Sequence, residues 1–175
     1  MTISMTQASV PVYNQMLGSL SILLDKAEAF ATAKKIDGTV LVNARLAADM
    51  LPLSRQVQLA CDLAKNAAAR LAGVEAMKFE DNEKTLPELK QRIAKALAYI
   101  NSIPTKDIDA GATREITFPM GPDRKGTMTG ADYLQHYGLP NFYFHTTMAY
   151  ALLRHCGVEI GKRDFLGAVS GLTIV

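Results

Sequence analysis

The sequence predicts an all-α fold: a four-helix bundle with a kinked second helix and a small β-hairpin between helices three and four. Two observations carry this prediction. Four segments repeat apolar residues at steps of three and four, which places one apolar stripe along an α-helix. One short stretch, from Glu115 to Met120, instead alternates polar and apolar residues, as a half-buried strand does.

The first two helical segments cover about 10–33 and 41–71. A turn at Asp37-Gly38 separates them, and Gly73 is suited to end the second, because glycine readily adopts the left-handed conformation of a C-terminal cap. Pro52 lies inside the second segment and lacks a backbone donor. It therefore predicts a kink or break near Met50 and Leu51.

The third helix begins at the capping-box pattern Thr85-Leu86-Pro87-Glu88 and stops at Pro104. Its buried stripe is expected to be Leu86, Leu89, Ile93, Ala96, Leu97 and Ile100, with Lys90, Arg92 and Lys95 facing water. The fourth helix is predicted in two pieces. A short piece starts at Thr129, Gly138-Leu139-Pro140 interrupts it, and the main piece runs from Asn141 to His155.

The hairpin is expected to pair 115–120 with 126–129 across the turn Gly121-Pro122-Asp123. Pro119 restricts its strand to an edge of the sheet, because proline has no backbone N–H to donate to a neighbouring strand.

Composition excludes several classes of protein. The chain has 175 residues, 49% of them hydrophobic, which is enough for one core and predicts a single domain over 1–175. A net charge of +2 argues against disorder and against nucleic-acid binding. No apolar run approaches the ~20 residues of a membrane-spanning helix, and no basic region precedes Ser19-Leu24 as in a secretory signal. We therefore expect a cytoplasmic protein with Cys61 and Cys156 reduced.

Polar residues that fall on the apolar stripes are the candidate site. Asp49 and Gln56 point inward if the second helix keeps its register through Pro52, and Asn141 and His145 share one face of the fourth helix. Together with Tyr13 on the first stripe, they predict a polar pocket at one end of the bundle. Two interpretations stay open: a structural network that fixes helix register, or a ligand or metal pocket. Spacing alone argues against zinc, since neither H-x-x-x-H nor C-x-x-C occurs.

Long motifs resemble a known family. The stretch Leu46-Ala47-Ala48-Asp49-Met50-Leu51-Pro52-Leu53-Ser54-Arg55-Gln56-Val57 is similar to the second-helix motif of the uncharacterised bacterial family DUF1993. So are Leu139-Pro140-Asn141-Phe142-Tyr143-Phe144-His145 and the ending from Gly157 to Gly167. The resemblance covers nearly the whole chain. It implies membership of the DinB/YfiT-like superfamily of proposed metalloenzymes, whose members are four-helix bundles and often dimers.

The resemblance also implies a site. The superfamily's metal is held by one histidine from the second helix and an H-x-x-x-H pair from the last long helix. Here Asn141-x-x-x-His145 and Asp49 occupy the corresponding places, so a divalent metal, if bound, would be held by Asp49, Asn141 and His145. In an enzyme, His145 would be a ligand or general base and Asp49 its partner.

The alternative is a non-enzymatic homodimerising or small-ligand-binding module whose polar network is purely structural. Neither reading identifies a reaction.

Overall fold

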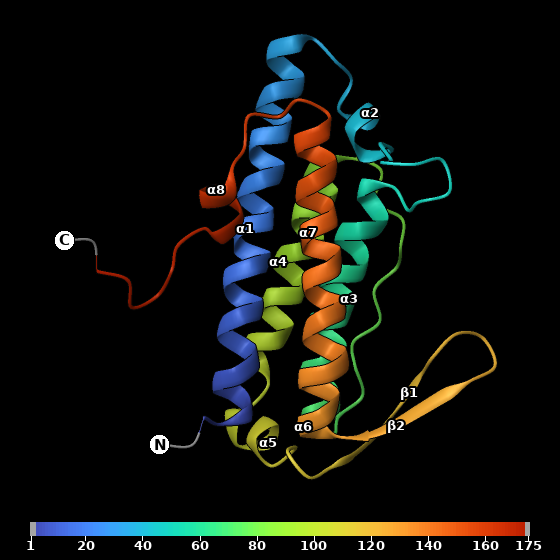
Figure 1. Ribbon diagram of the computed structural model, residues 1–175, viewed down its shortest axis with the longest axis vertical. Coiled ribbons are helices and arrows are strands. Elements are labelled where there is room, and N and C mark those ends of the chain that lie inside the picture. The colour runs from blue at the N-terminus through green and yellow to red at the C-terminus, as the bar shows by residue number, and fades with distance from the viewer. Residues whose placement is uncertain (1–2, 174–175) are drawn as a thin grey trace.

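The computed structural model describes residues 3–173 and is mostly helical, with one two-stranded antiparallel sheet (Figure 1). Its four long helices are α1 (Met5–Lys34), α3 (Leu53–Ala72), α4 (Leu86–Ser102) and α7 (Leu139–His155). They lie side by side, and α1 and α3 each contact both α4 and α7. α1 and α7 run upward in Figure 1, whereas α3 and α4 run downward.

Shorter elements complete the chain. They are α2 (Gly38–Val42), α5 (Thr105–Asp109), β1 (Glu115–Pro119), β2 (Lys125–Thr129), α6 (Gly130–Asp132), the π-helical turn η1 (Tyr133–Gly138) and α8 (Lys162–Leu166). Within residues 3–173, no helix combines the length and the apolar character needed to cross a membrane.

The prediction of one kinked second helix is wrong. Of the kink or break expected near Pro52, the structure has the break. α2 ends at Val42, residues 43–52 are not helical, and α3 begins at Leu53. Pro52 has extended backbone angles, φ −70° and ψ 166°, at the N-cap position of α3. Its missing N–H costs nothing there, and its ring disfavours helix in the residue before it. The N–H of Leu53 donates to the Ala44 carbonyl at 3.0 Å, which closes the loop.

The interruption predicted at Gly138-Leu139-Pro140 is also different in the structure. Gly138 and Leu139 keep right-handed helical angles, so the chain stays helical from α6 through η1 into α7. The turn before Pro140 widens to a π-helix instead of breaking. Such a turn changes the hydrogen-bond register of the backbone at a point where the proline cannot donate.

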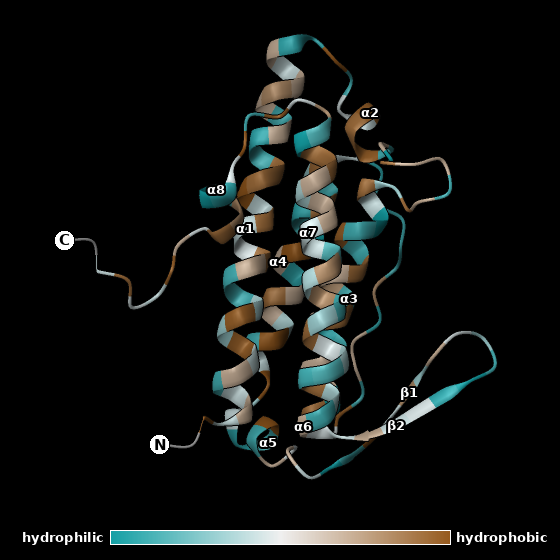
Figure 2. Ribbon diagram, in the orientation of Figure 1, coloured by the Kyte–Doolittle hydropathy of each residue, from teal (hydrophilic) through white to brown (hydrophobic). Residues whose placement is uncertain are grey.

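The predicted hairpin is present, with Glu115 opposite Thr129 and Pro119 opposite Lys125. β1 buries Ile116 and Phe118, and the Phe118 ring lies 5.0 Å from that of Tyr133. β2 is white to teal over most of its length in Figure 2, whereas Met128 is half-buried and packs against the core. A two-stranded sheet is marginal by itself, so packing of the β1 aromatic ring on η1 holds the hairpin to the helices.

Residues 73–85, here called the crossing segment, return along α3 and α4 without forming helix or strand (Figure 1). Arg92 of α4 is only 2% exposed beneath this segment. Its Nη2 lies 3.0 Å from Asp62 and 2.9 Å from Asp81, and its Nη1 lies 3.0 Å from Glu83. The prediction that Arg92 faces water is therefore wrong, because the crossing segment covers that face of α4 and brings two carboxylates to it.

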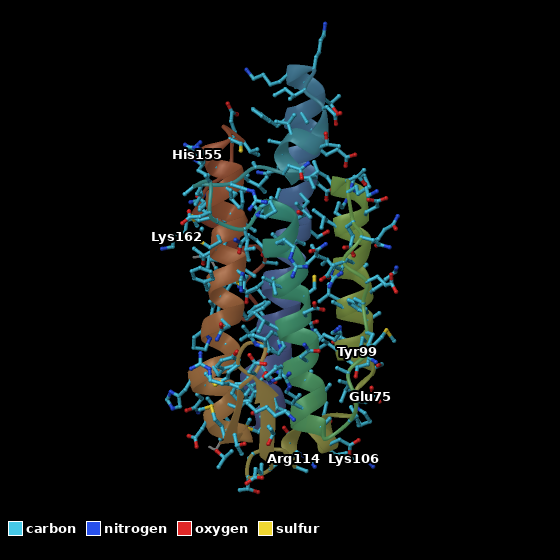
Figure 3. The ribbon with its side chains drawn as sticks, turned by 90° about the vertical axis from the view of Figure 1, so that its right-hand side faces the viewer. Glu75, Tyr99, Lys106, Arg114, His155 and Lys162 are labelled. Carbon is cyan, nitrogen blue, oxygen red and sulfur yellow. The ribbon has the colours of Figure 1, made fainter. Side chains whose placement is uncertain are left out.

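Further contacts hold the lower part of the crossing segment. Lys65 Nζ donates to the Met77 carbonyl at 2.6 Å and lies 4.4 Å from the centre of the Phe79 ring. Tyr99 donates its hydroxyl to the Glu75 carbonyl at 3.1 Å, and the two residues lie together at the lower end of α4 in Figure 3. Side chains of α3 and α4 therefore replace the backbone ladder that this segment lacks.

Arg92→Ala should lower the free energy of unfolding by roughly 2–4 kcal/mol, because it removes the buried cation that three carboxylates share. We expect a smaller loss than for breaking a fully buried ion pair, since Asp62 and Asp81 keep part of their hydration. Urea unfolding measures it. Lys95→Ala, at an exposed position of the same helix, is the control and should change stability by about 0.5 kcal/mol or less. Equal stability of the two variants would contradict a supporting role for Arg92.

Candidate functional site

A histidine–glutamine pair joins α7 to α3. His145 Nδ1 lies 2.8 Å from Gln56 Oε1. Gln56 is buried, and its Nε2 donates to the Leu51 carbonyl at 3.3 Å. Because the amide nitrogen donates to the Leu51 carbonyl, the amide oxygen accepts from the imidazole, and Nδ1 carries the proton. The other ring nitrogen, Nε2, then keeps its lone pair and can accept a hydrogen bond or a proton.

The surroundings of His145 favour its neutral form. Burial lowers the pKa of His145, and the positive charge of Arg55 lowers it further. Arg55 Nη1 is held by Gln58 Oε1 at 2.7 Å and by the Asp81 carboxylate at 2.5 Å. The imidazole at neutral pH is therefore an uncharged hydrogen-bond acceptor at Nε2, half-buried between α7 and α3.

Asp49 does not join this pair. It lies in the non-helical segment 43–52 and is exposed. The expectation that Asp49 points inward is wrong, because it required a helix that stays in register through Pro52.

Tyr13 and Asn141 have other partners. The Tyr13 ring is buried and packs edge-on against Phe142, with centroids 5.0 Å apart. Its hydroxyl has no hydrogen-bond partner among residues 3–173, and burial raises its pKa well above the usual value. Asn141 is half-buried, and its Nδ2 donates to the Tyr137 carbonyl in η1 at 2.7 Å. Of the five predicted site residues, Gln56 and His145 are the two that hydrogen-bond to each other.

These residues do not fit a metal centre. Across residues 3–173, no three His, Cys, Asp or Glu side chains come close enough to hold an ion. Of the three ligands that the resemblance implies, Asp49 is on an exposed loop, and Asn141 and His145 each bond to other groups. Catalytic zinc sites use three protein ligands and an open position. His145 alone offers one nitrogen lone pair.

Two features escaped the sequence-based prediction. Arg55, which lies beside His145, is fixed by Asp81 of the crossing segment, and nothing in the pattern of 73–85 indicates that it folds back. For Arg92, the sequence does contain a pattern that indicates burial. It follows Leu89 by three positions and precedes Ala96 by four, so it lies on the apolar stripe that the sequence itself defines.

The motif resemblance is confirmed by comparison with known proteins. The family model "Domain of unknown function (DUF1993)" matches residues 5–166. The chain belongs to the DUF1993 family. Its structure is similar to the crystal structure of a DinB family member protein from Shewanella denitrificans, with a TM-score of 0.87 and 46% sequence identity over 95% of this chain and 94% of that one. No curated protein matches this DUF1993 chain.

Acid should lower the free energy of unfolding of the DUF1993 chain, because His145 resists protonation in the folded state. An unfolded histidine titrates near pH ~6.5, and the folded pKa lies below that value. The unfolded state therefore binds the proton first, so the His145 contribution is complete above pH ~6.5 and is lost as pH falls through the folded pKa. In urea unfolding across this range, His145→Gln should lose less stability than the wild type.

The matched control is His155→Gln, at an exposed position at the upper end of α7 (Figure 3). It should keep the pH profile of the wild type. Parallel profiles for His145→Gln and the wild type would mean that His145 does not resist protonation in the folded state.

Proposed function

We propose that the protein is a single-domain, DinB-like four-helix bundle that acts as a metal-independent binding module in a homodimer, with His145 and Gln56 as the polar part of its ligand site. The observation that carries this proposal is the 2.8 Å contact between His145 Nδ1 and Gln56 Oε1. This contact fixes the tautomer and leaves Nε2 as a neutral acceptor. The two free thiols, Cys61 and Cys156, support a cytoplasmic location.

The surroundings of the pair define the ligand class. The Phe144 ring is 55% exposed, and its centroid lies 5.1 Å from that of the His145 ring, edge-on. Leu51, whose carbonyl holds Gln56, is 42% exposed. Binding sites for small molecules typically combine apolar or aromatic surface with a few placed polar groups. We therefore expect a small, partly aromatic ligand that offers one hydrogen-bond donor to His145 Nε2.

Phenol tests this expectation, since it has one O–H donor and one aromatic ring. At millimolar concentration it should shift the ¹⁵N resonance of His145 Nε2 in spectra of the labelled wild-type protein, because the ring nitrogen accepts the phenol proton. Gln56→Glu is a useful second sample, because its carboxylate still accepts from Nδ1–H.

The phenol shift should persist in Gln56→Glu at a pH high enough to keep the imidazole neutral, because the new carboxylate raises the pKa of His145. Cyclohexanol, which has the donor but no aromatic ring, should give a weaker response. An Nε2 resonance that neither probe shifts would contradict the proposed ligand site.

The resemblance implies a degenerate site, in which the residues that hold metal in the superfamily have been replaced. Asn141 and His145 keep the i,i+4 spacing of the superfamily's histidine pair, and Gln56 faces His145 from α3. The double variant Gln56→His, Asn141→His would restore three imidazoles. It should bind one zinc ion per chain, because three imidazole ligands suffice for a zinc site, and zinc should raise its melting temperature until EDTA is added.

Protein without a histidine tag is required, and the single variant Asn141→His is the control. The wild type and the single variant should hold no stoichiometric zinc in elemental analysis. Stoichiometric metal in the wild type would overturn metal independence. A double variant that does not bind zinc would show that Gln56 and Asn141 do not lie at ligand positions.

A further inference from the structure

Between residues 75 and 84, the crossing segment is attached to the helices through side chains. Within the part of the chain that the structure describes, the backbone of this stretch forms no hydrogen bond with another backbone group. Three of its carbonyls instead accept hydrogen bonds from side chains of α3 and α4: that of Glu75 from Tyr99 at 3.1 Å, that of Met77 from Lys65 at 2.6 Å and that of Glu80 from Arg92 at 2.9 Å. The donors that hold the segment therefore lie outside it.

A hollow lies on each side of the crossing segment. One, of about 650 Å³, separates it from part of α3 and is lined by Asp62 and Lys65. The other, of about 340 Å³, lies toward α4 and is lined by Arg92 and Lys95. Phe79 borders both hollows. The segment therefore contacts the two helices at separate points and not along a continuous packed surface.

Little of the hydrophobic core belongs to this segment. Among residues 3–173, the core has no buried apolar side chain between Ala72 and Leu86, and Phe79 is only half-buried. Five of the six residues 77–82 are exposed. The four long helices have contacts of their own, and the ion pair of Arg92 with Asp62 joins α4 to α3 without the segment. The helices therefore keep an interface when the segment is removed from them.

The charges that attach the segment regain water when it leaves the helices. Asp81 is 41% exposed even where it meets Arg92, whose side chain is 1% exposed. The hydration lost by buried charges offsets much of the attraction within an ion pair. Opening therefore restores hydration and exposes little apolar surface. Segments with few buried apolar contacts and no backbone ladder open locally, at a lower free energy than the whole molecule unfolds.

We propose that the crossing segment opens and closes as one unit over α3 and α4 while the four long helices stay packed. In the closed state, Asp81 and Glu83 cover the guanidinium of Arg92, and Asp81 also holds Arg55. Opening breaks these contacts together, so Arg55, Lys65 and Arg92 face water on the same side of the molecule. The crossing segment is thus an internal acidic cover for a cationic surface on α3 and α4.

Limited trypsin digestion of the full chain tests the proposal. Lys78 and Lys84 are exposed trypsin sites within the crossing segment, and Arg124 and Lys125 of the hairpin are exposed reference sites outside it. When opening and closing are fast relative to cleavage, the cleavage rate follows the population of the open state. The wild type should be cut within the crossing segment before any site in a long helix. Mass spectrometry identifies each cut.

Variants of the helices test the attachments and leave the sequence that trypsin cuts unchanged. Lys65→Met removes the charged donor to the Met77 carbonyl and should raise the cleavage rate at Lys78 roughly tenfold. Tyr99→Phe removes only a hydroxyl that donates to the segment and should raise this rate a few-fold. Lys95→Met is the matched control, because Lys95 is an exposed residue beside the same segment. It should keep the wild-type rate.

Circular dichroism and equal cleavage rates at the hairpin sites confirm that all three variants are folded. Equal rates at Lys78 in Lys65→Met and Lys95→Met, or in Tyr99→Phe and the wild type, would overturn the closure by side chains. Cuts in the long helices as early as at Lys78 would mean that the segment opens only when the whole molecule unfolds. None of these results depends on the proposed ligand site.

Discussion

The arrangement of α3 and α4 depends on the buried guanidinium of Arg92. These helices are parallel neighbours, so the chain must return along the whole length of α3 before α4 can begin. An extended segment gains ~3.3 Å per residue and a helix 1.5 Å, so residues 73–85 can cover ~40 Å against the ~30 Å of α3. The length suffices, but the segment has no ladder to hold it. Carboxylates converging on Arg92 from Asp62, Asp81 and Glu83 supply that attachment.

The same network reaches the candidate site. The crossing segment covers the side of α3 that α4 and α7 leave open, and no residue of α3 is fully exposed. Gln56 is thereby held on a helix that is packed on every side. Arg55, one residue earlier, bonds to Asp81 of the crossing segment and lowers the pKa of His145. One set of charges therefore both fixes the return of the chain and favours the neutral imidazole.

Sequence reasoning succeeded where the determinants are local. The capping box of Thr85 and Glu88 forms as predicted, and Gly73 ends α3 in the left-handed conformation, because both depend on residues within one turn. The apolar stripes on two helices predicted that Gln56 and His145 both point inward, but the predicted partner of His145 was Asp49 and not Gln56. The orientations of Asp49 and Arg92 could not be found in this way. Asp49 depends on where the chain resumes after Pro52, and Arg92 depends on carboxylates that only the folded crossing segment supplies.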